Sequence, residues 1–397
     1  MKRRVRILHP NKKDIYKELE KIDVDKYALD IFNNKSKINL IKIKNLKIEE
    51  ANILKQDALS VGADTAIPRS SISGNPNITD VILFATNREL EKLKVKLKKQ
   101  PFSLDNLYSE IEFALKDNPK YFEFNNKKLS LKKPKIMGIL NITPDSFYDG
   151  GKYSKEEQIK NRVKNMIDEG VDIIDLGAES TRPGSERVAL HEELERLLPA
   201  VEIIKNINGD IPLSIDTYKS KVAEKMLRAG ADIINDISGF TFDENMPEVV
   251  SKYNAGIIIM HIKGTPKNMQ KNPYYEDVIE EIYDYFIHKI NIAEKNGIGH
   301  SHIAVDPGIG FGKRLEDNLE IIRRLKEFKS LGFPLLMGLS RKSFLKPLTG
   351  RKVDRRLAGT IAANTISLLN GANILRVHDI KETRDLINTF EGINYEN

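Results

Sequence analysis

The sequence predicts an α/β protein in which a (β/α)8 TIM barrel follows a smaller α+β domain. Eight short apolar runs recur between residues 134 and 397, and each is followed by a polar loop and a segment with helical periodicity. Residues 1–133 lack this regularity, so we place the domain boundary between residues 133 and 134. The length of 397 residues is enough for two or three domains.

The first domain is expected to combine strands and helices in no repeating order. The runs VRIL (5–8), INLIKI (38–43) and DVILFA (80–85) predict strands, and ATNRELEKLKVKLKK (85–99) and SLDNLYSEIEFAL (103–115) predict helices. The segment KDNPKYFEFNNKKLSLKKPK (116–135) is rich in Asn, Lys and Pro and is expected to be a linker.

The barrel is expected from the strands that its repeats supply. These runs are rich in Val, Ile and Leu, as expected of parallel strands that are covered on both faces. They are IMGIL (136–140), VDIIDL (171–176), PLSID (212–216), ADIIND (231–236), GIIIMH (256–261), HIAVD (302–306), PLLMGLS (334–340) and ANILRV (372–377). A doubly wound sheet is the alternative, but it rarely runs to eight regular units without an antiparallel edge.

Composition narrows the class of protein. The chain has no Cys, which excludes disulfides and thiolate nucleophiles and fits a reducing cytoplasm. We expect no membrane association, because no apolar stretch approaches the ~20 residues that span a bilayer. The net charge of +7 belongs to the first domain, where 28 Lys+Arg face 18 Asp+Glu, against 36 and 39 in the remainder. A solvated helix face explains these lysines better than a nucleic-acid site does, since no aromatic residues are interleaved with them.

The Gly-rich stretch DPGIGFGK (306–313) invites comparison with a phosphate-binding loop. Only three residues separate Gly308 from Gly312 and Arg follows Lys313, whereas a P-loop needs four residues and then Ser or Thr. A plain turn and a site centred on Asp306 are the remaining interpretations.

A polar residue stands at the end of nearly every apolar run. The stability of a barrel does not by itself require polar residues at these positions. In a barrel these positions gather at one mouth, where catalytic residues lie. They are Asn141, Glu179, Asp216, Asn235, Asp236, His261, Asp306, Ser340, Arg341, Lys342, Arg376 and His378. Carboxylates, an amide and a lysine suit an aminoheterocycle, and the Arg and His residues suit phosphate oxygens. Glu179 and Asp236 are interpreted as structural, and His261 equally as a packed or a functional residue.

Eight motifs resemble, in order and one per strand, those of the dihydropteroate synthase family, over about residues 134–390. They are MGILNITPDSFYDGG, DIIDLGAESTRPGS, LSIDTYKSKVAEKML, IINDISG, MHIKGTPKNMQ, VDPGIGFGK, GLSRKSFL and RVHD. The resemblance implies a transferase of folate biosynthesis. Such an enzyme condenses 6-hydroxymethyl-7,8-dihydropterin diphosphate with 4-aminobenzoate and releases pyrophosphate.

The resemblance also implies a pterin pocket. Asp306 would pair with the 2-amino and N3–H groups of the ring, and Asn235 would contact the neighbouring edge. Asp216 would lie on the N8 side, and Lys342 would donate to O4 and N5. Side chains expected to flank the ring are Met260 and Phe311.

The remaining implied roles concern the diphosphate and the aminobenzoate. Catalysis is assigned to Asp216, Lys342, Arg182 and Asp149; diphosphate binding to Asn141, Arg182, Arg376 and His378; and the aminobenzoate slot to Phe147, Thr181, Pro183 and Ser343. Asn141 would be the ligand of a Mg²⁺ cofactor. The family further implies a homodimer and inhibition by sulfonamides.

Two other functions share parts of this pattern. A pterin-dependent methyltransferase would use the pterin pocket but not the TRPG, SRKS and Arg-x-His elements. A barrel that has lost catalysis and only binds pterin is the other alternative.

Overall fold

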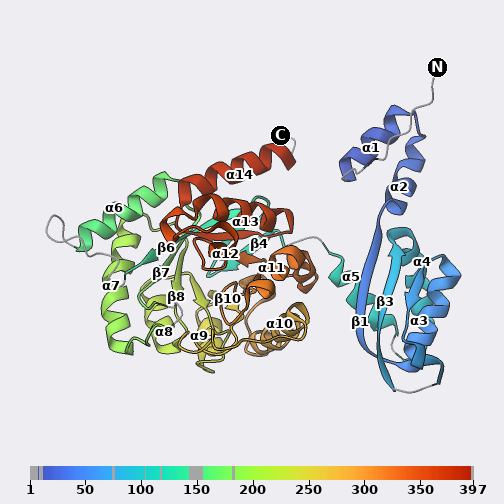
Figure 1. The fold of residues 1–397 in the computed structure, drawn as a ribbon, viewed down its shortest axis with the longest axis horizontal. Coiled ribbons are helices and arrows are strands. Elements are labelled where there is room, and N and C mark those ends of the chain that lie inside the picture. Colours follow the sequence, from blue (N-terminus) through green and yellow to red (C-terminus); the bar gives the residue numbers. More distant parts are fainter. Residues whose placement is uncertain are drawn as a thin grey trace. The chain divides into compact units, whose positions relative to one another are not determined.

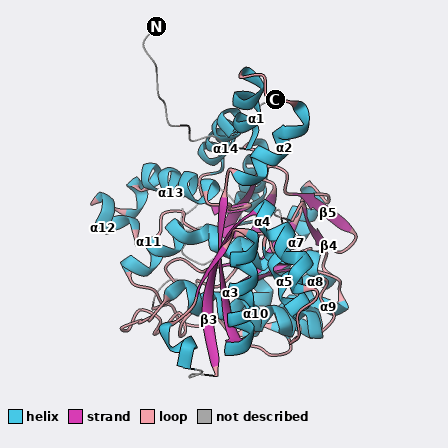
Figure 2. Cartoon of the chain, turned by 90° about the vertical axis from the view of Figure 1, so that its right-hand side faces the viewer, coloured by secondary structure: helices cyan, strands magenta, loops and turns pink. Residues whose placement is uncertain are grey.

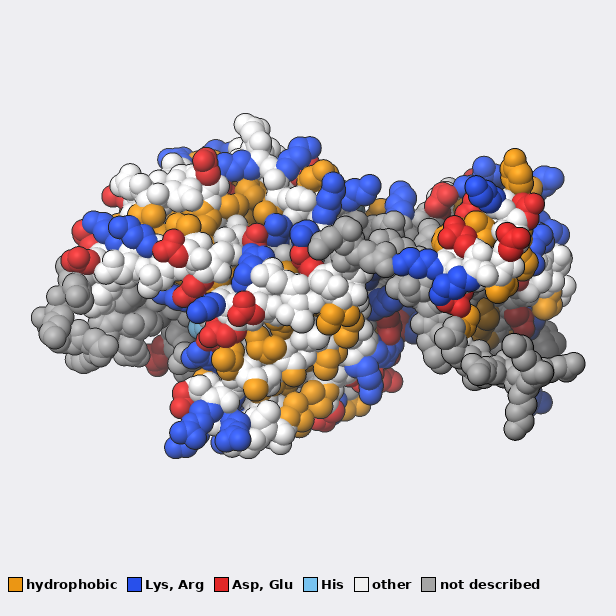
Figure 3. Space-filling view, turned by 90° about the horizontal axis from the view of Figure 1, so that it is seen from above, with side chains coloured by type: hydrophobic (Ala, Val, Ile, Leu, Met, Phe, Trp, Pro, Cys, Tyr) orange, Lys and Arg blue, Asp and Glu red, His pale blue; other side chains and the backbone are white. Residues whose placement is uncertain are grey.

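The computed structural model describes residue 8 and residues 12–73, 77–102, 104–116, 119–142, 155–180 and 184–394. The chain forms two compact units, Met1–Leu115 and Lys116–Asn397. In the described residues no helix is long and apolar enough to cross a membrane. On the face in Figure 3, Lys and Arg side chains are interspersed with Asp and Glu and are not gathered into one basic stripe.

The first unit is an antiparallel sheet with helices packed on one face. Its strands are β1 (Ile38–Lys47), β2 (Asp64–Ala66) and β3 (Ile78–Thr86), in the order β1-β3-β2. Side chains alternate along β3, so that Val81 and Leu83 are buried against α3 and α4 (Figure 2). The helices are α1 (Lys12–Lys21), α2 (Lys26–Lys35), α3 (Ile48–Val61), α4 (Asn87–Leu97) and α5 (Leu104–Ala114), with a 3₁₀ turn at Arg69–Ser73.

The α+β class expected for this unit is confirmed, although helices α1, α2 and α3 and strand β2 were not among the expected elements. Helix α3 was not expected, because its sequence IEEANILKQDALSV mixes polar and apolar residues with only weak periodicity. The expected strand VRIL lies outside the described residues except for Leu8.

The expected linker folds as part of the second unit. Strands β4 (Tyr121–Phe124) and β5 (Lys127–Ser130) form an antiparallel hairpin whose turn includes Asn125 in the left-handed region, at φ 51°. Phe122 and Phe124 are 0% and 1% exposed and pack into a cluster with Met137, Ile173 and other strand residues. The two units therefore divide between Leu115 and Lys116 and not between residues 133 and 134.

The second unit is the expected (β/α)8 barrel (Figure 1). Its strands are β6 (Lys135–Asn141), β7 (Ile173–Gly177), β8 (Leu213–Asp216), β9 (Ile233–Asp236), β10 (Gly256–Met260), β11 (Ile303–Asp306), β12 (Leu336–Met337) and β13 (Ile374–Val377). All neighbouring pairs are parallel, in the order β11-β10-β9-β8-β7-β6-β13-β12. A parallel bridge between Val305 and Leu335 joins the two ends of this order and closes the barrel.

Helices follow the strands and cover the outside of the barrel. They are α6 (Lys155–Asp168), α7 (Leu190–Ile207), α8 (Ser220–Arg228), α9 (Met246–Lys252), α10 (Val278–Lys295), α11 (Leu315–Arg324), α12 (Leu345–Thr349), α13 (Leu357–Leu369) and α14 (Ile380–Asn394). Short 3₁₀ turns lie at His300–His302, Leu325–Leu331 and Val353–Arg355.

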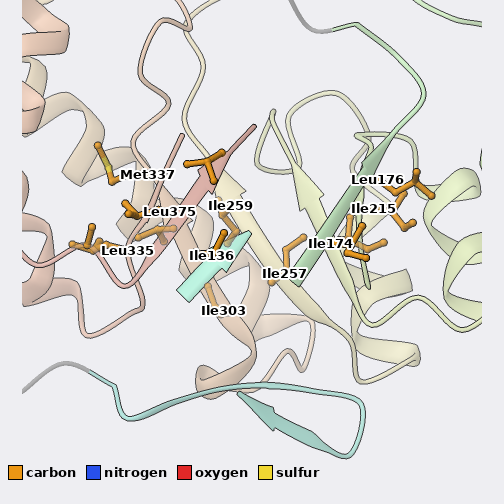
Figure 4. Packing of buried hydrophobic residues seen from close by; sticks show 14 of the residues in the cluster. Ile136, Ile174, Leu176, Ile215, Ile257, Ile259, Ile303, Leu335, Met337 and Leu375 are labelled. Atoms are coloured by element: carbon orange, nitrogen blue, oxygen red, sulfur yellow. The ribbon is translucent and has the colours of Figure 1, made fainter. Parts of the chain in front are cut away.

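The core has an outer layer and a plug at the amino end of the strands. Ile174, Ile215 and Ile257 belong to a large aliphatic cluster that the covering helices complete (Figure 4). Residues one position away along the strands, such as Ile173 and Ile258, belong instead to the cluster that contains the two phenylalanines of the hairpin. Because side chains alternate along a strand, this second set points into the barrel. The hairpin thus closes one end, and the opposite end is left for polar residues.

Candidate functional site

The alternation that builds the core also places the polar residues at the barrel's other end. Ile173 points inward at the amino end of β7, so Asp175 two positions later also points inward. On four other strands the residue two positions after an inward apolar residue also points inward. These pairs are Ile233 and Asn235, Ile258 and Met260, Ala304 and Asp306, and Ile374 and Arg376. Side chains from β7, β9, β10, β11 and β13 therefore converge in the barrel interior, as the sequence predicted for all but Asp175.

Arg376 lies between two buried carboxylates. Its Nε donates to Oδ2 of Asp175 at 2.6 Å, and its Nη2 donates to Oδ2 of Asp216 at 2.7 Å. Asn235 Nδ2 also donates to Oδ2 of Asp175, at 3.2 Å. Burial raises the pKa of Asp216 to about 7, an effect that Arg376 opposes and the nearby charge of Asp175 increases. Ion pairing within the protein was not expected for Arg376, whose assignment to the diphosphate stays a prediction.

Asp306 and Lys342 form a second polar group. Oδ1 of Asp306 accepts from the backbone N–H of Gly308 at 2.8 Å, and the side chain is 4% exposed. Burial raises the pKa of Asp306, while Lys342 opposes the shift. Burial likewise lowers the pKa of Lys342 to about 8, opposed by Asp306. A carboxylate and an amine held in this way suit the donor and acceptor edges of one heterocycle.

The loop after β11 holds Lys342 in place. Nζ of Lys342 donates to the carbonyl oxygen of Ile309 at 2.5 Å and lies 4.6 Å from the centre of the Phe311 ring. Arg356 donates to the carbonyl oxygens of Arg341 and Lys342, at 2.9 and 3.2 Å. Hydrogen bonds thus fix both the amine of Lys342 and the backbone that carries it.

The glycines of DPGIGFGK allow two loops of the barrel to approach each other closely. A Cβ on Gly308 would lie 2.0 Å from the carbonyl oxygen of His261, and one on Gly312 would lie 2.2 Å from that of Lys263. Both have positive φ, of 69° and 63°. The β11 loop therefore packs directly against the backbone that follows β10, which only glycine allows.

Lys313 joins the same two loops from within. Its buried Nζ lies 2.9 Å from Nδ1 of His261 and donates to the carbonyl oxygens of Phe311, at 3.1 Å, and His261, at 3.4 Å. Burial holds the pKa of Lys313 and of His261 well below their ordinary values, and the lysine adds to the shift of the histidine. His261 is thus a packed residue, the first of its two interpretations.

The two carboxylates interpreted as structural have partners that explain them. Asp236 accepts from the backbone N–H groups of Ser238 and Phe240, at 2.8 and 2.7 Å, and so shapes the turn after β9. Glu179 accepts from Tyr218 Oη at 2.9 Å and from Lys219 Nζ at 2.6 Å.

Met260 and Phe311, the two residues expected to flank the ring, pack in the same small apolar cluster. Met260 is 3% exposed and packs in a small cluster with Tyr218, Ile237 and Met269, against which Phe311 also packs. His378 lies at the end of β13, with Nδ1 3.0 Å from Oγ of Ser340. Ser343, assigned to the aminobenzoate slot, is exposed beside Lys342.

Several expected site residues lie outside the described residues. They are Phe147, Asp149, Thr181, Arg182 and Pro183. Asn141, the expected metal ligand, ends β6, and its Oδ1 would lie 3.2 Å from a Cβ on Gly177 of the neighbouring strand. Within the described residues no group of three or more His, Cys, Asp and Glu could hold a metal ion. One amide oxygen fits Mg²⁺ only if phosphate oxygens and waters complete the coordination, which is common for this ion.

Asp175 is the site residue that sequence reasoning missed. It lies inside the run VDIIDL, one position before the last apolar residue, and reasoning from the ends of the runs passed over it. A carboxylate at an inward position of a strand that is otherwise apolar is the signal that would have found it.

Comparisons with known proteins agree with this geometry. The family model described as pterin binding enzyme matches residues 137–378. A bifunctional dihydropteroate synthase/dihydropteroate reductase from Helicobacter pylori is 38% identical over 377 residues, which cover 94% of this chain and 95% of the relative. A dihydropteroate synthase from Clostridium beijerinckii is 46% identical over 248 residues, 62% of this chain and 89% of the relative. The crystal structure of a dihydropteroate synthase from Clostridium difficile in the presence of pteroic acid is 42% identical, with a TM-score of 0.63, and covers 69% of this chain and 100% of that one.

Proposed function

The chain belongs to the family of pterin-binding enzymes, and from this premise we propose how its barrel carries out the reaction of a dihydropteroate synthase. It is a transferase that condenses 6-hydroxymethyl-7,8-dihydropterin diphosphate with 4-aminobenzoate to give 7,8-dihydropteroate and pyrophosphate. The assignment of individual residues below is our proposal.

The pterin ring is recognised inside the mouth of the barrel. Asp306 accepts from the 2-amino and N3–H groups, a charge-assisted pair of hydrogen bonds worth ~1.5–3 kcal/mol each. Lys342 donates to O4 and N5 from the opposite side of the same pocket. The observation that supports this proposal is the arrangement of the buried Asp306 with the partly buried Lys342 and Phe311, in which Lys342 Nζ lies 4.6 Å from the centre of the Phe311 ring.

The remaining pterin contacts come from the strands beside Asp306. Asn235 contacts the edge of the ring next to the 2-amino group. Asp216 faces the N8 side, and Met260 packs with Phe311 against the faces of the ring.

Cleavage of the bond to the diphosphate leaves a positive charge on the pterin and a negative charge on pyrophosphate. The bond between the exocyclic carbon and the diphosphate oxygen breaks, and both electrons leave with pyrophosphate. The carbon that remains is cationic and is stabilised through the pterin ring by the carboxylate of Asp216. The amine of 4-aminobenzoate then bonds to this carbon and loses a proton.

The leaving diphosphate needs positive charge at the rim. Arg376 and His378 at the end of β13 are assigned to it, with Arg182 from the loop after β7. Asn141 would hold Mg²⁺ together with the diphosphate oxygens, and the ion would supply charge neutralisation there. Chelation of Mg²⁺ by EDTA should abolish turnover and excess Mg²⁺ should restore it; undiminished turnover in EDTA would reject this role.

The aminobenzoate slot and its closure involve the loops after β6 and β7. Phe147, Thr181, Pro183 and Ser343 are assigned to the slot, and Asp149 to ordering the closed loops. Sulfonamides, which resemble 4-aminobenzoate, should therefore compete with that substrate and leave the KM for the pterin unchanged. An unaltered KM for 4-aminobenzoate would count against the slot.

The assay that tests the function measures pyrophosphate release from the dihydropterin diphosphate with and without 4-aminobenzoate. A synthase forms dihydropteroate only when both are present, and absence of pyrophosphate release in both conditions would exclude it. A pterin-dependent methyltransferase or a non-catalytic pterin-binding barrel would release none.

A second activity is favoured by the extent of one comparison. Of this chain's 397 residues, 94% (about 373) match the Helicobacter pylori relative, and the barrel unit, 116–397, holds 282 of them at most. The match therefore includes at least about 90 residues of the first unit. That relative is named a dihydropteroate reductase as well as a synthase.

We propose that this chain also reduces 7,8-dihydropteroate. Reduction would add a hydride to C6 of the pterin and a proton to N5, with a reduced nicotinamide or flavin as donor. Incubation of the enzyme with dihydropteroate and each donor should give a product heavier by two hydrogen atoms, detected by mass spectrometry. The same incubation with a chain that begins at Lys116 is the control. Absence of the reduced product with every donor would reject this activity and leave the synthase unaffected.

We also propose a homodimer, following the family. Light scattering during size-exclusion chromatography should give twice the chain mass of 45.2 kDa. A mass of one chain would reject the dimer.

A further inference from the structure

Asp175 links three elements of the barrel through one carboxylate oxygen. Its Oδ2 accepts from Nε of Arg376 on β13, at 2.6 Å, and from Nδ2 of Asn235 on β9, at 3.2 Å. Arg376 in turn donates to Asp216 on β8. Asp175 on β7 is therefore the common partner of two residues that we assign to substrate binding, and it is one hydrogen bond away from a third.

Asp175 has no direct access to a substrate. Its side chain is 0% exposed, whereas the side chain of Arg376 is 19% exposed. Any influence of Asp175 on the reaction must pass through the residues that it holds. It therefore qualifies as a positioning residue and not as a catalytic one.

Burial of the Asp175 carboxylate is unfavourable for folding. Its second oxygen, Oδ1, is buried without a hydrogen-bond partner in the described part of the chain. A buried polar atom without a partner costs ~1–3 kcal/mol, and a buried charge is costlier still unless it is paired. An apolar residue at this inward position would avoid this cost, so packing alone does not account for the carboxylate.

The geometry of the guanidinium shows what the carboxylate provides. Arg376 has a planar fork of N–H groups, and two of its nitrogens are fixed by Asp175 and Asp216 on neighbouring strands. Without Asp175, the Nε edge would lose its acceptor and the arginine could rotate away from Asp216. Asn235 would lose an acceptor of its amide at the same time.

We propose that Asp175 is a positioning residue of the synthase site, which orients Arg376 and Asn235 toward the dihydropterin diphosphate. The inference rests on the proposed function, since both oriented residues are assigned to that substrate and neither to the aminobenzoate. Loss of Asp175 should therefore affect one substrate and not the other.

The test is the kinetics of Asp175→Asn with each substrate varied in turn. We expect kcat/KM for the dihydropterin diphosphate to fall at least ~10-fold, mostly through KM, while KM for 4-aminobenzoate changes less than ~2-fold. The matched control is Ser214→Ala. Ser214 is the register neighbour of Asp175 on β8, is also 0% exposed and has no hydrogen-bond partner in the described residues. Within the described residues its side chain makes no hydrogen bond to any of the assigned groups, and its variant should stay within ~2-fold of the unmodified enzyme.

A double-mutant cycle then asks whether Asp175 acts through Arg376. In an Arg376→Lys background, Asp175→Asn should cost less than it costs in the unmodified enzyme, because only its effect through Asn235 is left to lose. Independent, multiplying effects of the two changes would overturn the proposal, as would equal rises in KM for both substrates or an unchanged Asp175→Asn enzyme.

Folding is monitored by thermal unfolding in parallel. If Asp175→Asn does not fold, Asp175→Ser, which is smaller and keeps an acceptor, replaces it. Failure of both variants to fold would contradict the proposal, because it would show that the residue serves the fold. The unmodified enzyme decides the proposed function separately: no pyrophosphate release from it rejects the synthase, whatever the variants do.

Discussion

The backbone of Gly308 passes so close to His261 that a Cβ on the glycine would lie 2.0 Å from the histidine's carbonyl oxygen. This contact joins the loop that follows Asp306 and carries Phe311 to the end of β10, where Met260 lies. The shape of the proposed pterin pocket therefore depends on a close approach of two backbone segments.

Gly308→Ala should lower both stability and activity. Its φ of 69° and the clash with His261 add, so we expect a loss of more than ~2 kcal/mol in the free energy of unfolding, measured by urea titration. Gly350→Ala is the matched control, since its φ is 67° and a Cβ there would meet nothing within 4 Å. It should lose only the ~1 kcal/mol of the backbone strain. Equal losses in the two variants would show that the close approach does not matter.

Lys342→Met should lower kcat/KM for the dihydropterin diphosphate at least ~100-fold, because a partly buried charge-assisted donor is removed. Methionine keeps most of the apolar stem, so stability should change little. Lys346→Met, at an exposed position one turn further along the chain, is the control and should leave kinetics unchanged. A loss of less than tenfold at Lys342 would exclude it from the pterin contacts.

The pH profile of kcat/KM should be bell-shaped. Asp216, with its pKa raised to about 7 by burial, must be ionised to stabilise the cation, so activity should rise as pH increases through about 7. Lys342, with its pKa lowered to about 8 by burial, must be protonated to donate, so activity should fall as pH increases through about 8. Substitution Lys342→Arg should remove the alkaline limb from whatever activity is left. An alkaline limb that persists in that variant would assign it to another group.

The raised pKa of Asp216 also predicts how the free energy of unfolding depends on pH. The folded chain holds a proton on Asp216 up to about pH 7, whereas the unfolded chain releases it near the ordinary value of 3.8. Between these pH values the folded state binds more protons, so the contribution of Asp216 to the free energy of unfolding should fall as pH rises. Denaturant titrations of the unmodified protein and of Asp216→Asn, at pH 4.5 and 7.5, should show a smaller pH dependence in the variant. An identical pH dependence in both would contradict the raised pKa.

The eight strands of the barrel were predictable because their apolar runs are short, regular and separated by helical segments. The residues at the mouth were predictable for the same reason, since the end of a run marks the end of a strand. Asp306, Asn235 and Arg376 are found this way, and their inward direction follows from the alternation along each strand.

Other features depend on contacts that a linear pattern does not carry. Asp175 lies within an apolar run, and only the barrel brings it to Arg376, 201 residues away. The reason for Gly308 and Gly312 is the approach of another loop, whose position the sequence does not give. The sequence of the hairpin at residues 121–130 predicts a linker instead, because Asn and Lys surround its two buried phenylalanines.

The central claim is that Asp306 recognises the pterin inside the barrel, and calorimetric titration of 6-hydroxymethylpterin into the unmodified protein and Asp306→Asn tests it most directly. Asparagine has the same shape but presents an N–H where an acceptor is needed, so the account predicts at least ~100-fold weaker binding by the variant. Binding within a factor of a few of the unmodified protein, with an unchanged melting temperature, would contradict it.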